Sequence, residues 1–171
     1  MKELSTLSKV FAVIALASIS VWIGAYLTRQ FLVYQIFEGP DLILKNYLNE
    51  NNLSGVLTEL LPSILIHFIT FIIFIVSFFL FVITSRLKLR LNGWLFIILI
   101  ATIIIVPFES YLMLIDYKVI LLLYSGSFDS NQVIALLRDR IKDLSSFPIV
   151  AILTFISFYY FIVFKPLTKK E

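Results

Sequence analysis

Two carboxylates lie inside a stretch that is otherwise fit for lipid, IIVPFESYLMLIDYK, residues 104–118. Glu109 and Asp116 are seven positions apart, and Thr102 lies seven positions before Glu109, so the three residues share one face of a helix. A charged side chain at the middle of a membrane costs about 2.5–3.5 kcal/mol on insertion scales, so an acid there normally faces protein or water. We therefore expect Glu109 to have a polar companion on another helix.

His67 is the best-placed companion. It belongs to a second polar stripe with helical spacing, made of Ser63, His67, Thr70, Ser77 and Thr84. With a rise of about 1.5 Å per residue, Glu109 lies roughly 21 Å from the inner boundary and His67 roughly 9 Å from the outer one, the same level in a core of about 30 Å. Asp116 falls near the outer interface, and Arg29 ends an earlier apolar stretch at a similar height, within reach of its long side chain.

These four residues, Glu109, His67, Asp116 and Arg29, form a predicted intramembrane polar site. One interpretation is a site that handles protons or cations, with Glu109 and His67 at depth and Asp116 and Arg29 at its mouth. The other is structural: a buried acid and its partner fix the alignment of neighbouring helices. We favour the structural interpretation, because the sequence offers a single acid at depth.

Few other residues suggest chemistry. The sequence contains no cysteine and one histidine, which excludes disulfides, thiolate nucleophiles and metal or haem sites that need several such ligands. It contains no glycine-rich phosphate loop, no H-E-x-x-H and no G-x-S-x-G pattern. We therefore predict no catalytic residues, no cofactor and no metal, and an enzyme is the less favoured interpretation. An intramembrane enzyme acting on a lipid would need a further acid or base near Glu109.

The elements that must position these residues are membrane-spanning helices. Of the 171 residues, 60% are hydrophobic and 15% are charged, and the mean hydropathy is +1.00. Soluble domains have about 45–50% apolar and about 25% charged residues. A span needs about 20 mostly apolar residues, and four stretches qualify: 10–28, 60–84, 93–115 and 146–164. The first could belong to a cleaved signal peptide, but its apolar run continues through VWIGAYL, so we predict an uncleaved span.

The charges of the connecting segments predict the orientation. Basic residues without acids mark the connection 85–92, which contains Arg86, Lys88 and Arg90, and basic residues dominate the tail, which contains Lys165, Lys169 and Lys170. The connection between the first two spans is mostly acidic, with Glu38, Asp41, Glu50 and Glu59 against Lys45. Because cytoplasmic segments are enriched in lysine and arginine, we place both termini in the cytoplasm and the two larger connections outside.

Two outer segments are predicted to form amphipathic helices, at about 41–50 and 129–144. The second has Ser127 and Asp129 as candidate caps, and its apolar face contains Val133, Ile134, Leu137, Ile141 and Leu144. These helices could either cap the membrane helices of this chain or bind a partner.

The first span has a strip of small residues, Ala17, Ser20, Gly24 and Thr28. Small residues let another helix approach closely within a membrane, so this strip is a predicted helix-packing face.

These observations predict an all-α protein: one integral membrane domain over residues 1–171, a bundle of four transmembrane helices with one or two amphipathic helices on the outer side.

Four helices enclose little room for a substrate pathway, so we expect an accessory or scaffolding subunit of a larger complex in the plasma (inner) membrane. The alternative is an oligomeric transporter or channel protomer that uses Glu109 and His67. The expected partners are the lipid bilayer and a larger membrane protein or further copies of the chain. Nucleic acid is not expected, because the basic residues flank apolar spans.

Overall fold

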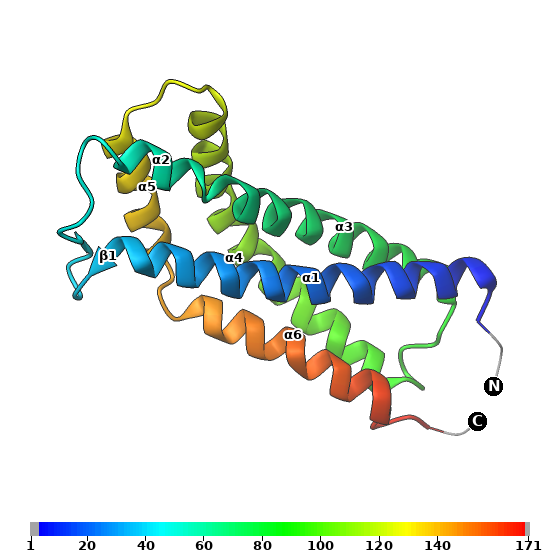
Figure 1. Cartoon of the computed structure of the whole chain (residues 1–171). Coiled ribbons are helices and arrows are strands. Elements are labelled where there is room, and N and C mark those ends of the chain that lie inside the picture. The colour runs from blue at the N-terminus through cyan, green and yellow to red at the C-terminus, as the bar shows by residue number, and fades with distance from the viewer. Residues whose placement is uncertain (1–3, 170–171) are drawn as a thin grey trace. The chain divides into compact units, whose positions relative to one another are not determined.

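The computed structural model describes residues 4–169. In these residues the elements, in chain order, are α1 (Thr6–Ile36), β1 (Phe37–Glu38), β2 (Ile43–Leu44), α2 (Leu53–Thr58), α3 (Leu61–Ser85), α4 (Gly93–Tyr124), α5 (Ser130–Lys142) and α6 (Phe147–Phe164) (Figure 1). Lys170, one of the basic tail residues used to predict the orientation, lies outside the described residues.

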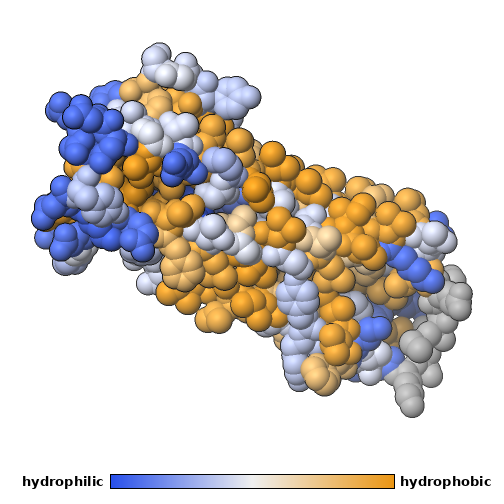
Figure 2. Space-filling model, in the orientation of Figure 1, coloured by the Kyte–Doolittle hydropathy of each residue, from blue (hydrophilic) through white to orange (hydrophobic). Residues whose placement is uncertain are grey.

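Four helical segments within this part of the chain are long and apolar enough to cross a membrane: Thr6–Ile36, Leu53–Ser85, Gly93–Tyr124 and Phe147–Phe164. Apolar residues cover much of the helix surface in Figure 2, whereas hydrophilic residues gather over the segment between β1 and α2. The predicted fold class, an all-α protein with four membrane-spanning helices, is therefore confirmed. The chain is a multi-pass membrane protein.

Prolines mark the beginning of two of these helices. Pro62 is the second residue of α3, and Pro148 lies in the first turn of α6. A proline at these positions is tolerated because the first N–H groups of a helix have no partner within the helix. By contrast, Pro107 lies inside α4, which continues through it to Tyr124.

The helix predicted at about 41–50 is wrong. Residues 37–44 form a short antiparallel hairpin, in which Phe37 pairs with Leu44 and Glu38 with Ile43. Gly39 and Leu42 have positive φ angles of 68° and 54°, which are incompatible with a right-handed helix. Asparagine side chains then turn the backbone: the Asn51 N–H donates to Asn49 Oδ1 at 3.0 Å, and the Asn49 N–H donates to Asn52 Oδ1 at 2.9 Å. The helix that follows, α2, begins only at Leu53.

The helix predicted at 129–144 is present as α5. The Asp129 side chain caps it by accepting the Asn131 N–H at 2.9 Å. Val133, Ile134 and Leu137 are buried, as the periodicity predicts. Leu144 departs from that prediction, because it lies beyond the end of α5 with a φ of 54° and is exposed.

The described residues pack as two compact units. The first unit comprises residues 4–20, 70–110 and 146–169, and the second unit comprises residues 21–69 and 111–145. The predicted single transmembrane domain over residues 1–171 stays a prediction.

The first unit has an aromatic core and an ordered basic end. The ring of Phe155 in α6 meets those of Phe74 and Phe158 at centroid distances of 5.4 and 5.3 Å. Beyond α6 the Gly93 N–H donates to the Leu167 carbonyl at 3.2 Å, and the Lys169 N–H donates to the Leu91 carbonyl at 2.9 Å. These bonds place the tail beside the connection between α3 and α4.

The second unit has an aliphatic core supplied by α1, the hairpin, α2, α3, α4 and α5. Its buried members are Val33, Ile36, Phe37, Leu42, Leu53, Leu57, Leu60, Ile64, Val119, Ile120, Leu123, Val133, Ile134 and Leu137. Arg138 links α5 to the loop of the hairpin by donating from Nε to the Leu42 carbonyl at 3.0 Å. The amphipathic helix α5 is therefore packed on this core through its apolar face.

Candidate functional site

Asp116 is the centre of a buried charge cluster in the second unit. Arg29 Nη1 donates to Asp116 Oδ2 at 2.6 Å, and Arg29 Nη2 donates to Asp116 Oδ1 at 2.5 Å. The exposed fractions are 4% for Arg29 and 0% for Asp116. A guanidinium that meets a carboxylate with two parallel bonds forms one of the strongest ion pairs available to side chains. This pair links α1 to α4.

A second arginine reaches the same carboxylate from α5. Arg140 Nε lies 3.3 Å from Asp116 Oδ1, and Arg140 Nη2 donates to the Tyr26 hydroxyl at 3.1 Å. Its guanidinium also lies over the Tyr26 ring, 5.5 Å from the centroid, which is a cation–π contact. Arg140 is 5% exposed. It therefore joins α5 to both α1 and α4.

His67 of α3 completes the cluster. Its Nδ1 lies 3.8 Å from Asp116 Oδ2. The imidazole also lies against two aromatic rings of α1, at centroid distances of 5.3 Å from Trp22 and 4.8 Å from Tyr26. We call the residues Asp116, Arg29, Arg140, His67 and Tyr26 the Asp116 cluster.

Helical periodicity explains why the cluster forms. In α1, Trp22, Tyr26 and Arg29 follow one another at steps of four and three and are all buried. In α4, Leu112, Asp116 and Val119 follow the same steps and are fully buried. The polar residues thus lie on the faces that these helices bury, so they had to find partners inside the protein.

The sequence analysis missed Arg140. The signal was present, because Arg140 lies seven residues after Val133 and three after Leu137, on the apolar face of α5. An arginine on such a face either extends its long side chain to the surface or pairs with an acid inside the protein. Asp116 supplies the partner here.

The predicted site residues are divided between the two units. Arg29, His67 and Asp116 lie together in the second unit, with the distances given above. Glu109 belongs to the first unit and is fully buried in α4. The predicted contact between Glu109 and His67 stays a prediction.

The small-residue strip of α1 is exposed along its whole length. Ala17, Ser20, Gly24 and Thr28 all lie on the surface, whereas Ile19, Trp22 and Tyr26 on the other side of the helix are buried. A Cβ atom added at Gly24 would meet no atom within 4 Å. The described part of the chain therefore leaves open space beside Gly24, whereas Ser20 Oγ shares a hydrogen bond of 2.6 Å with the Tyr159 hydroxyl of α6.

The Asp116 cluster is suited to linking helices through ion pairs. It brings together one carboxylate and two guanidiniums, so the charges attract and α1, α4 and α5 are held to one another. Removing one member of a buried ion pair leaves an uncompensated charge, which is strongly unfavourable. Among residues 4–169, no three histidine, cysteine or acidic side chains gather in a way that could hold a metal ion.

Comparisons of the chain with protein-family models, with curated proteins and with solved structures find no match.

Proposed function

We propose that this protein is an accessory or scaffolding subunit of a larger complex in the plasma membrane. The observation that carries the proposal is the exposed strip Ala17, Ser20, Gly24 and Thr28 on a helix long enough to span a membrane. Helix contacts within membranes are enriched in small residues, because these residues let two backbones approach closely. A surface that meets only acyl chains has no such requirement.

The hydroxyl groups of the strip support a packing role. Ser20 Oγ donates to the Leu16 carbonyl at 2.7 Å, and Thr28 Oγ1 donates to the Gly24 carbonyl at 2.9 Å. Because each hydroxyl donates within α1, and Ser20 Oγ also shares a hydrogen bond with the Tyr159 hydroxyl, the strip can lie against an apolar or small-residue face of another helix without leaving a polar group unpaired.

The Asp116 cluster also suits a subunit that serves as a rigid support. Its ionic groups contact one another and Tyr26. Within the second unit, such a cluster fixes the part of α1 that carries Gly24 and Thr28 relative to α4 and α5. The larger membrane protein, or a further copy of the chain, then meets a preformed surface.

Purification from the native membrane in a mild detergent tests this function. We expect the protein to be recovered with larger membrane subunits in a fixed stoichiometry, as measured by mass spectrometry. Gly24→Phe should abolish this recovery, because a bulky ring prevents close approach. Val150→Phe is the matched control, since Val150 in α6 is 53% exposed and lies on another helix. Loss of the partner in both variants, or in neither, would argue against docking through the strip.

A transporter or channel protomer is a second candidate. Several ionisable side chains, those of Asp116, Arg29, Arg140 and His67, are buried in one cluster, and three of these four lie in helices able to cross a membrane. Ionisable residues inside membrane spans often belong to ion or proton pathways. The sequence analysis also places Glu109 on such a pathway, as the partner of His67. Flux of protons or cations into liposomes that is lost in Glu109→Gln would favour this candidate, whereas unchanged flux would exclude a path through Glu109.

The proposed orientation, with both ends of the chain in the cytoplasm, has its own test. The pairing of the tail with the connection between α3 and α4 requires them to share one side, and their basic residues favour the cytoplasm. Because the sequence contains no cysteine, single cysteines at Lys88 and Asn51 can be labelled separately in intact cells. We expect a membrane-impermeant maleimide to label position 51 and not position 88.

A further inference from the structure

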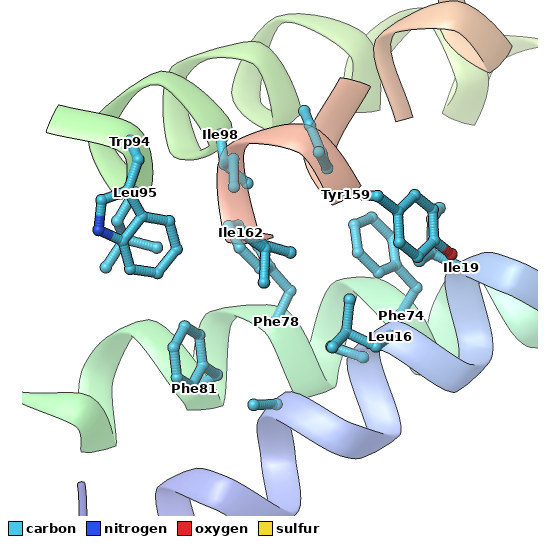
Figure 3. Close-up of a pocket in the computed structure, with 13 residues that line it drawn as sticks. Leu16, Ile19, Phe74, Phe78, Phe81, Trp94, Leu95, Ile98, Tyr159 and Ile162 are labelled. Carbon is cyan, nitrogen blue, oxygen red and sulfur yellow. The ribbon is translucent and has the colours of Figure 1, made fainter. Parts of the chain in front are cut away.

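The first unit contains an apolar cavity of about 80 Å³ that is partly open. Aromatic rings form much of its wall, with Phe81 and Trp94 at one end and Phe74 and Tyr159 at the other (Figure 3). The Tyr159 hydroxyl shares a hydrogen bond of 2.6 Å with Ser20 Oγ, so its polar atom already has a partner. The wall itself is entirely apolar.

A cavity of this kind attracts an apolar occupant. A buried water needs two to four polar partners, and engineered apolar cavities of about 150 Å³ stay dry while binding benzene or xenon. The present cavity is smaller, so it suits a short stretch of a chain and not a bulky ring system. In a membrane the abundant molecules of this chemistry are acyl chains.

A cation lies beside the end of the cavity that Trp94 forms. Lys165 Nζ is 6.0 Å from the centre of the Trp94 ring. Lys165 follows the last residue of α6 with a φ of 45°, and the tail after it is bonded to the connection between α3 and α4. The backbone around Lys165 is therefore ordered, and its side chain reaches the Trp94 ring at the end of the cavity.

The exposed charged side chains described in the first unit are basic. Among the described residues of the first unit, the exposed charged side chains are those of Lys9, Arg86, Lys88, Arg90, Lys165 and Lys169. The one acid in the same set is Glu109, which is buried. Basic clusters at the end of membrane helices attract anionic lipid head groups.

The geometry points to a binding site for an anionic glycerophospholipid, with part of one acyl chain in the cavity and the phosphate near Lys165. The apolar wall selects the acyl chain, and the basic end selects the charge of the head group. This site lies in the first unit, whereas the Asp116 cluster lies in the second unit. It is also separate in chemistry from the proposed docking of a protein partner on α1.

Fluorescence quenching by brominated lipids tests this proposal on the full-length chain. The sequence contains two tryptophans, and Trp22→Phe leaves Trp94 as the sole reporter at the cavity. The protein is reconstituted into phosphatidylcholine vesicles that contain acyl-brominated phosphatidylglycerol or, in parallel, acyl-brominated phosphatidylcholine. We expect brominated phosphatidylglycerol to quench Trp94 at a several-fold lower fraction of the membrane. Retention of phosphatidylglycerol, measured by native mass spectrometry of the unsubstituted protein, provides a second readout that does not depend on Trp22→Phe.

Two variants separate the two parts of the site. Lys165→Gln should reduce the preference for phosphatidylglycerol about fivefold, the factor that corresponds to about 1 kcal/mol for one lysine at a membrane surface. Ala12→Leu, which places a larger side chain in the cavity wall, should reduce quenching by either brominated lipid. Lys118→Gln is the matched control, because Lys118 is an exposed lysine of the second unit.

Several results would overturn the proposal. Equal quenching by the two brominated lipids would remove the selection for charge, and an equal loss of preference in Lys118→Gln would reduce it to general surface attraction. Absence of quenching by both lipids, together with a dimer in native mass spectrometry, would assign the cavity to a second copy of the chain.

Discussion

Replacing Asp116 by asparagine leaves the guanidiniums of Arg29 and Arg140 buried beside a neutral amide. The carboxylate is 0% exposed and Arg29 is 4% exposed, with donor–acceptor distances of 2.5 and 2.6 Å. The small value of about 0–1 kcal/mol for exposed ion pairs therefore does not apply. Breaking a buried pair by removing one partner costs about 3–5 kcal/mol. Asparagine has nearly the same shape as aspartate, so the loss of stability comes from removing the negative charge.

The expected consequence is a large fall in thermal stability. For a chain of this length, 1 kcal/mol corresponds to about 2–4 °C in Tm, so Asp116→Asn should lower Tm by roughly 6–20 °C. Circular dichroism at 222 nm during heating in detergent measures it. Asp139→Asn is the matched control, because Asp139 is an exposed aspartate of α5 in the same unit. Exposed substitutions of this kind change stability within about 0.5 kcal/mol. Equal Tm values for Asp116→Asn and the unsubstituted protein would refute the assignment of a buried, mutually dependent charge cluster.

Three further changes probe other parts of the structure. Arg140→Met should lower Tm less than Asp116→Asn, by the equivalent of about 1–3 kcal/mol, because the arginine from α1 still pairs with the carboxylate; an equal or larger fall on heating would contradict this order. Asp129→Ala removes the cap of α5 and should cost about 1 kcal/mol, seen as faster amide exchange in the first turn of α5 and not in α6. Gly93→Ala would place its Cβ 2.7 Å from a side-chain atom of the tail, so exchange of the Lys169 amide should accelerate; unchanged exchange would mean that the tail adapts.

The membrane helices were predictable because their signal is local. A run of about 20 apolar residues has few alternatives to a spanning helix, since every backbone polar group must be satisfied within the segment. The same holds for α5, where the Asp129 cap and the spacing of Val133, Ile134 and Leu137 are contained within a few residues. Leu144 was assigned wrongly to this face because the helix ends two residues before it.

The hairpin after α1 was harder to predict. Residues 41–50 contain apolar positions that fit a short helix, but Gly39 and Leu42 adopt positive φ angles and the asparagines bond to nearby backbone groups. A glycine and a run of asparagines were the available signals for a turn. The positive φ of Leu42 had no signal in the sequence, because leucine rarely adopts it.

The partners within the polar site depended on long-range packing. Counting the rise per residue placed Arg29 and Asp116 at a similar depth, and they form a salt bridge. Depth alone could not show that Arg140 of α5 would contact the Asp116 carboxylate, since that contact requires α5 to pack on the core of the second unit. Depth also could not show that His67 would lie 3.8 Å from Asp116, because residues at one level can lie on faces that point in different directions.

Photocrosslinking at position 21 in the native membrane tests the central claim most directly, because Val21 is 49% exposed and lies beside the small-residue strip without belonging to it. With a benzophenone amino acid at Val21, we predict a crosslink to a larger membrane protein, and no such product with the same amino acid at Val150. Crosslinks from position 21 to lipid alone would contradict the proposed docking role.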